Sequence, residues 1–208
     1  MTLESSKTLG GIGAILLFIG VIPFLQYLWV IGIVGVILIM VALHDFANVY
    51  KESGIFSNAM YGVAIAIVGG IVAAVLALAV ALTNLKDFLT QIYPGWNGNW
   101  ASLQGMTPNT NNIDPTAIFP FIAGILAVLV IVWIFAIIAA FFVWRSLKQV
   151  SNKSSVGLFG TAGLILLIGA IIPVIGIVLM WISALILAIA FFTLKPQEQS
   201  MQSMMPPA

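Results

Sequence analysis

Long, almost uninterrupted apolar stretches constrain this chain more than any other feature of its sequence. The first runs from Leu9 to Ala42, with Gln26 as its only strongly polar residue. A transmembrane helix needs about 20 apolar residues, so this stretch is too long for one span and suits two short ones. The break between them falls at Pro23, because proline removes a backbone donor and disfavours continued helix.

The composition of the whole chain also indicates a membrane protein. Of its 208 residues, 62% are hydrophobic and only 6% are charged, whereas soluble domains carry roughly a quarter charged residues. A water-soluble fold of this size cannot bury so much apolar surface, because surface-to-volume scaling limits the buried fraction. A lipid bilayer removes that limit. The sequence therefore predicts an all-α fold, a polytopic membrane helix bundle whose first partner is the lipid bilayer.

When every apolar stretch is interpreted as a membrane-spanning helix, the sequence predicts one transmembrane domain over residues 1–194. The polar, proline-containing residues 195–208 should form a disordered cytoplasmic tail. The polar residues 83–114 are expected to be an outer loop that opens with a short amphipathic helix lying in the interface. Asp114 followed by Pro115 is typical of a helix start. The six predicted helices cover about residues 8–25, 28–46, 58–82, 115–145, 157–174 and 177–194.

The basic residues predict which helix ends face the cytoplasm. With six spans and an internal N-terminus, six of the seven Lys and Arg residues lie inside, and short loops rich in positive charge stay cytoplasmic. Both termini should therefore be cytoplasmic, and only Lys86 should lie outside. The cluster of Arg145, Lys148 and Lys153 either contacts anionic headgroups or acts as a topology signal alone. The inner residues are Lys7, Lys51, Arg145, Lys148, Lys153 and Lys195.

The two ends of the chain resemble each other. Two glycines and a proline recur in matching positions of the first and the last apolar stretch. One interpretation is a duplicated helical hairpin, as is common in transporter folds. The other is a chance match, because Gly, Ile and Leu dominate this chain. The matching pairs are Gly10 and Gly160, Gly13 and Gly163, and Pro23 and Pro173.

Two lines of small residues run along the third predicted helix at a spacing of four. Small residues let helices approach closely in lipid, where packing replaces the hydrophobic effect as the source of association. The lines therefore predict either an interface with a second copy or another membrane protein, or packing within the protein's own bundle. The first line is Gly62, Ala66, Gly70 and Ala74, and the second is Gly69, Ala73, Ala77 and Ala81.

Residue types that carry chemistry are scarce. No ionisable residue lies well inside an apolar stretch, which argues against a proton-coupled transporter, and the chain has no cysteine. A net charge of +1 argues against a nucleic-acid partner, which needs a basic face. His44 and Asp45, with Asn48 and Glu52 nearby, form either an interfacial polar cap or part of a metal or acid–base site. We predict no catalytic, metal or cofactor site.

Two short stretches resemble a known family. Residues 3–13, and residues 55–62 at the start of the third predicted helix, are similar to an uncharacterised, mainly archaeal family of multi-pass membrane proteins, known as domain of unknown function 996. The resemblance extends over most of the chain, up to about Leu194. It implies a location in a prokaryotic, archaeal plasma membrane, and it supplies no activity, cofactor or catalytic residue.

These observations lead to two expectations for function. The small-residue lines and the lack of buried charge favour a non-enzymatic structural or accessory subunit of a membrane assembly. The repeated hairpins favour a small passive transporter or channel for a neutral solute instead. A continuous polar cavity between the helices would support transport, and a dry, closely packed interior would argue against it.

Overall fold

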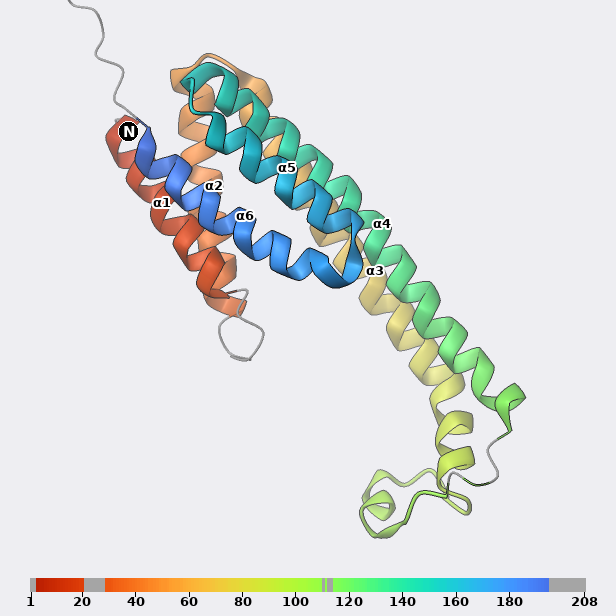
Figure 1. The fold of residues 1–208 in the computed structure, drawn as a ribbon. Coiled ribbons are helices and arrows are strands. Elements are labelled where there is room, and N and C mark those ends of the chain that lie inside the picture. Colours follow the sequence, from red (N-terminus) through yellow and green to blue (C-terminus); the bar gives the residue numbers. More distant parts are fainter. Residues whose placement is uncertain (1–2, 21–28, 110, 112–113, 195–208) are drawn as a thin grey trace, which may run out of the picture. The chain divides into compact units, whose positions relative to one another are not determined.

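The computed structural model describes residues 3–20, 29–109, 111 and 114–194. These residues form helices joined by turns and loops, with no strand among them, so the prediction of an all-α helical bundle is confirmed. Figure 1 shows the helices in chain order. They are α1 (Leu3–Gly20), α2 (Trp29–Val49), α3 (Ser53–Ile92), the 3-10 helix η1 (Trp100–Gly105), α4 (Pro115–Ser154), α5 (Gly157–Ile171) and α6 (Pro173–Thr193).

The chain divides into two compact units. The first contains residues 1–63 and 137–208, and the second contains Ala64–Ala136. The first unit holds α1, α2, α5 and α6, together with the first turns of α3 and the last turns of α4. Because α3 and α4 contribute to both units, the single transmembrane domain over residues 1–194 stays a prediction.

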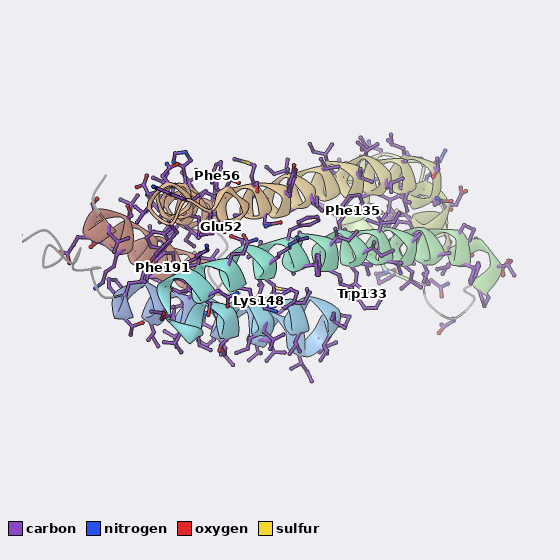
Figure 2. All side chains as sticks on the ribbon, turned by 90° about the horizontal axis from the view of Figure 1, so that it is seen from above. Glu52, Phe56, Trp133, Phe135, Lys148 and Phe191 are labelled. Carbon is purple, nitrogen blue, oxygen red and sulfur yellow. The ribbon has the colours of Figure 1, made fainter. Side chains whose placement is uncertain are left out.

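Three buried aromatic rings mark the centre of the first unit. Phe46 of α2, Phe159 of α5 and Phe191 of α6 are all fully buried; Figure 2 labels Phe191. The ring centroids of Phe159 and Phe191 lie 5.1 Å apart in an edge-to-face arrangement. Phe46 lies 5.8 Å from Phe191 and 6.4 Å from Phe159. Each such pair is worth about 0.5–1.5 kcal/mol beyond the area it buries, so the rings tie α2 to the consecutive helices α5 and α6.

Glycines bring neighbouring backbones into contact in two hairpins of this unit. A Cβ atom added to Gly35 of α2 would lie 2.5 Å from the carbonyl oxygen of Gly13 in α1, and one added to Gly13 would lie 2.8 Å from the oxygen of Gly35. Gly169 and Gly176 make the same kind of contact between α5 and α6. A Cβ atom is not tolerated this close to a rigid backbone oxygen, so only glycine fits at these crossings.

Side chains of the first unit also satisfy carbonyl groups on neighbouring helices. The buried hydroxyl of Ser183 in α6 donates to the carbonyl of Ala162 in α5 at 2.7 Å. The indole Nε1 of Trp181 donates to the carbonyl of Phe18 at 3.0 Å, and the two rings stack. The last four carbonyls of a helix have no partner within it. Trp181 therefore gives the end of α1 a hydrogen bond that lipid cannot provide.

The second unit is an antiparallel hairpin of α3 and α4, closed by the loop that holds η1 (Figure 1). A Cβ atom added to Gly69 of α3 would lie 2.6 Å from the side chain of Phe135 in α4. Nearer the loop, the rings of Phe88 and Phe121 stack with centroids 4.5 Å apart. The two helices therefore stay in contact along the hairpin.

Side-chain hydrogen bonds order the loop of this unit. The buried Trp96 donates its Nε1 hydrogen to the carbonyl of Asn99 at 2.7 Å, and the Asn99 side chain caps η1 by accepting from the amide of Ala101 at 3.0 Å. Asp114 accepts from the hydroxyl and the amide of Thr116 at 2.8 and 2.9 Å. These bonds lower the pKa of the Asp114 carboxyl below its ordinary value and confirm the predicted start of α4.

The predicted interfacial helix is wrong as a separate element. Residues 85–92 continue α3, which runs without a break to Ile92. The polar side chains that suggested a break, Thr83 and Asn84, bond back to carbonyls one turn earlier in the same helix. They therefore fit within the helix, and the strong helix breakers come only at Pro94 and Gly95.

Other helix ends also differ from the predicted ones. α4 continues past its predicted end at residue 145 to Ser154, because no proline or glycine lies between Arg145 and Gly157. α3 begins at Ser53 and α1 at Leu3, each one turn or more before its predicted start. The predicted end of the first helix at residue 25, the break at Pro23 and the predicted tail at 195–208 lie outside the described residues.

Five of the described helices, α1, α2, α3, α4 and α6, are long and apolar enough to cross a membrane, judged by length and composition. α5 has 15 residues, fewer than the about 20 that a span needs. It is shorter than its predicted range because α6 begins at Pro173, immediately after Ile172.

Replacing Gly35 with alanine is expected to destabilise the protein by about 1–3 kcal/mol, because the added methyl group meets a backbone oxygen that cannot rotate away. Gly32→Ala is the matched control on the same helix, since a Cβ atom there would approach no atom closer than 3.5 Å. An SDS titration of the purified protein in mild detergent, followed by far-UV circular dichroism, measures the difference. Equal unfolding midpoints for the two variants would contradict the close backbone contact.

Candidate functional site

The second line of small residues on α3 faces α4. Gly69 contacts Phe135 of α4, and Ala73 is half-buried. Ala77 and Ala81 line an apolar groove of about 220 Å³ together with side chains of α4. Ala77 itself is exposed, so for this line packing within the protein's own bundle and an interface both stay predictions.

The first line divides into a covered and an uncovered part. Gly62 is buried, and a Cβ atom added there would lie 2.7 Å from the side chain of Val143 in α4. Ala66, Gly70 and Ala74 are exposed. A Cβ atom added to Gly70 would meet no atom of the described part of the chain within 4 Å. We call Ala66, Gly70 and Ala74 the outer line.

Branched apolar side chains flank the outer line. Ile67, Ile71 and Val75 each follow one of its members, and they are 58%, 60% and 62% exposed. β-branched side chains have little rotamer freedom to lose when they are packed. A furrow of small residues beside a ridge of such side chains suits close contact with another membrane helix.

The second candidate site is a polar pocket where α2 ends and α3 begins. Its volume is about 460 Å³. Both helices contribute polar side chains to it, and two apolar side chains complete the wall. The residues that line this polar pocket are His44, Ala47, Asn48, Lys51, Ser53 and Phe56.

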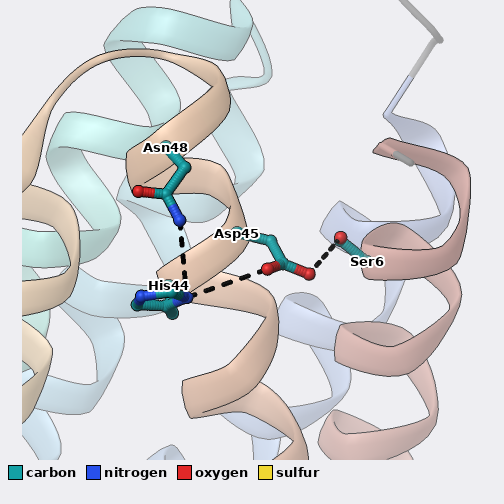
Figure 3. A network of polar contacts seen from close by, with 4 residues as sticks. All are labelled: Ser6, His44, Asp45 and Asn48. Carbon is teal, nitrogen blue, oxygen red and sulfur yellow. Dashed lines mark hydrogen bonds and ion pairs between the residues drawn. The ribbon is translucent and has the colours of Figure 1, made fainter. Parts of the chain in front are cut away.

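A chain of polar contacts fixes one wall of the pocket and links it to α1 (Figure 3). The hydroxyl of Ser6 donates to the carboxylate of Asp45 at 2.7 Å, and the other Asp45 oxygen lies 3.8 Å from Nδ1 of His44. The side-chain nitrogen of Asn48 lies 3.5 Å from the same Nδ1. The His44 ring also packs edge-to-face on Phe56, with centroids 4.9 Å apart. No described residue hydrogen-bonds to Nε2, the other ring nitrogen of His44.

Most other charges at this end of the first unit have partners. The ammonium group of Lys153 lies 3.3 Å from the Glu52 carboxylate. Lys7 donates to the carbonyl of Leu194, just beyond α6, at 2.6 Å. Lys51 differs, because its exposed side chain makes no hydrogen bond or ion pair with any described residue.

Lys51 also occupies a strained backbone position. α2 ends in a Schellman motif, in which the amide of Glu52 donates to the carbonyl of Ala47 at 2.9 Å and the amide of Lys51 to that of Asn48 at 3.4 Å. The motif places Lys51 in the left-handed region, with φ of 50°, where glycine is usual. Burial raises the pKa of the neighbouring Tyr50 hydroxyl above its ordinary value, so Tyr50 adds no anion there.

The predicted inner basic cluster is spread along the end of α4. Lys153 pairs with Glu52. Lys148, labelled in Figure 2, lies over the ring of Trp144 with its nitrogen 5.0 Å from the centroid. Arg145 is exposed. The three side chains thus have different surroundings.

The structure joins three of the four polar residues that the sequence groups near the end of α2. His44 contacts both Asp45 and Asn48, whereas Glu52 pairs with Lys153 of α4. Across the part of the chain that the structure describes, no three His, Cys, Asp or Glu residues lie close enough to hold a metal ion. Sequence reasoning missed Ser6, which lies 39 positions before its partner Asp45, because no local spacing predicts that contact.

Comparison with known proteins gives a family and no activity. The profile of a family described as "Protein of unknown function (DUF996)" matches residues 31–191. The chain is 24% identical over 202 residues to an uncharacterized protein of Methanocaldococcus jannaschii, covering 96% of this chain and 97% of that protein. No solved structure matches the chain. The family expected from the two short stretches is therefore confirmed.

Replacing Lys51 with glycine is expected to raise the free energy of unfolding by roughly 0.5–1 kcal/mol. Glycine removes about 1–2 kcal/mol of left-handed strain, and its greater freedom in the unfolded chain offsets part of that gain. Lys51→Ala keeps the strain and serves as the control, which should not be stabilised. The SDS titration measures both. A glycine variant no more stable than the alanine variant would argue against the left-handed position.

Proposed function

We propose that this chain, which belongs to the family described as "Protein of unknown function (DUF996)", is a structural or accessory subunit of a membrane assembly. The proposed role is non-enzymatic. The subunit binds a second copy or another membrane protein through the outer line of α3. The observation that carries this proposal is the open space at Gly70, where no atom of the described residues lies within 4 Å of an added Cβ.

The shape of the outer line supports a helix as its occupant. Ala66, Gly70 and Ala74 repeat every four residues, so they lie above one another on one face of α3. The ridge of Ile67, Ile71 and Val75 beside them is also uncovered. In lipid, a furrow of this kind gains energy only when another surface enters it closely, because dispersion forces act at short range.

The packing of the first unit favours this role over passive transport. Its central rings are fully buried, and every buried side-chain nitrogen and oxygen among the described residues has a hydrogen-bond partner. The polar pocket lies at one end of this unit, beside the turn that joins α2 to α3. A path for a neutral solute would need polar groups that line the interior instead.

The proposed location is the plasma membrane of an archaeon, crossed several times, with both termini in the cytoplasm. Contacts within the first unit support that orientation. The bond from Ser6 to Asp45 and the pair of Glu52 and Lys153 bring the start of α1 and the ends of α2 and α4 to one end of the unit. Basic residues gather at that end, and short positively charged segments stay cytoplasmic.

Gly70→Leu is expected to weaken association by about tenfold or more, because the leucine side chain fills the furrow. The fold should be unaffected, since the space around Gly70 is open. Ala79→Leu is the matched control, because Ala79 is also exposed on α3 but lies on a different face from the outer line. The chain contains no cysteine, so Ala101→Cys in the exposed loop gives one labelling site. Energy transfer between donor- and acceptor-labelled copies in liposomes then reports self-association.

A partner other than a second copy is tested on the same two variants. The tagged protein is purified from membranes in mild detergent, and its native mass is determined. Loss of a stoichiometric partner from Gly70→Leu, with retention by Ala79→Leu, supports an accessory subunit. A protein that stays monomeric and partnerless in every variant, and that conducts neutral solutes in liposomes, would instead be a passive transporter.

A further inference from the structure

We propose that the polar pocket between α2 and α3 binds a phosphate group, of the kind that an anionic lipid carries in its headgroup. The inference rests on the proposed membrane location. It does not depend on association through the outer line, which lies in the other unit.

The pocket gathers hydrogen-bond donors from two helix ends. Lys51 brings an ammonium group, Asn48 a carboxamide and Ser53 a hydroxyl. The Nδ1 atom of His44 faces Asn48 and Asp45, which leaves Nε2 for a ligand. A phosphate group consists of acceptor oxygens, so it matches this set of donors better than a neutral or cationic ligand does.

The charges around the pocket also favour an anion. The Glu52 carboxylate is paired with Lys153, and the Asp45 carboxylate accepts the hydroxyl of Ser6 and does not line the pocket. The ammonium group of Lys51 has no counter-ion among the described residues. Ser53 is the first residue of α3, and the first amides of a helix lack partners within it and carry the positive end of its dipole.

Exposed apolar side chains point to a lipid as the source of the phosphate. On α2, Val41 and Ile37 precede His44 by one and two turns and so lie on the same face. On α3, Met60 follows Phe56 by one turn. These three side chains are 36%, 55% and 44% exposed. A lipid whose phosphate occupies the pocket can therefore lay an acyl chain along this apolar track, whereas free phosphate would leave the track uncovered.

The test compares lipid binding by the full-length protein and its variants in a non-ionic detergent, with native mass spectrometry as the readout. Short-chain phosphatidylglycerol is the probe. Lys51→Gly should bind it about fivefold to tenfold more weakly than the unmodified protein, although the fold stays intact. Lys51→Arg keeps the charge and should retain binding. Lys86→Gln removes one positive charge from the exposed part of α3 in the second unit and should leave binding unchanged.

Two further probes identify the source of the phosphate. Phosphatidylcholine has a phosphate but no net charge, and its binding should depend less on Lys51. Inorganic phosphate is added as a competitor. Binding of phosphatidylglycerol that needs Lys51 and resists inorganic phosphate assigns the site to a lipid, whereas Lys51-dependent binding of inorganic phosphate alone assigns it to the free ion.

Equal binding of phosphatidylglycerol by Lys51→Gly and the unmodified protein, with no Lys51-dependent binding of inorganic phosphate, would overturn the proposal. The same holds if Lys86→Gln loses as much affinity as Lys51→Gly, because the effect would then reflect overall charge. Energy transfer between labelled copies is measured on Lys51→Gly as well. If energy transfer in Lys51→Gly equals that of the unmodified protein, the loss of lipid binding is independent of the proposed association. The two proposals can then fail separately.

Discussion

Close contact between helix backbones is the constraint on which the first unit depends. In a bilayer, helices as apolar as these gain little by exchanging lipid for one another, so their association rests on dispersion forces and hydrogen bonds that act over a few ångströms. The crossings of Gly13 with Gly35 and of Gly169 with Gly176 permit that approach. Hydrogen bonds then join residues that lie far apart in sequence: the hydroxyl of Ser146 in α4 donates to the carbonyl of Ile55 in α3 at 2.6 Å. α1 and α6 are tied at both ends, by Lys7 beyond the end of α6 and by Trp181 at the end of α1.

Apolar length and turn chemistry made most of the helices predictable from sequence. Asp114 caps α4 as its sequence context predicts, because an Asx side chain before proline acts locally. The predicted helix ends near residues 82 and 145 were wrong for one reason. Both were inferred from polarity, but a polar residue ends a helix only when it offers the backbone a better partner than the helix does. Thr83 and Asn84 bond to carbonyls of the helix itself.

The candidate sites were less predictable, because a period of four residues identifies a helix face and not its occupant. Eight small residues on α3 fit the pattern equally well, and only the position of α4 divides them into a covered and an open set. The duplicated hairpin stays a prediction for a similar reason. Gly10 packs against Phe191 of α6, whereas its counterpart Gly160 packs against Ser151 of α4. The two matching glycines thus pack in different pairs of helices. These contacts do not decide whether the hairpin is duplicated or the sequence match is due to chance.

At the polar end of the first unit, the residue at position 51 ends the turn after α2 and also places a side chain beside the polar pocket. A Schellman turn after α2 is satisfied best by glycine, which has no Cβ to strain. Lys51 occupies this position instead, and its ammonium group has no partner among the described residues, whereas Lys7 and Lys153 have theirs. Residues with a strained backbone conformation are found where the surrounding structure compensates for the strain. The turn is fixed by its two backbone hydrogen bonds, so it holds Lys51 beside the pocket, where a bound anion would pair with the Lys51 ammonium group.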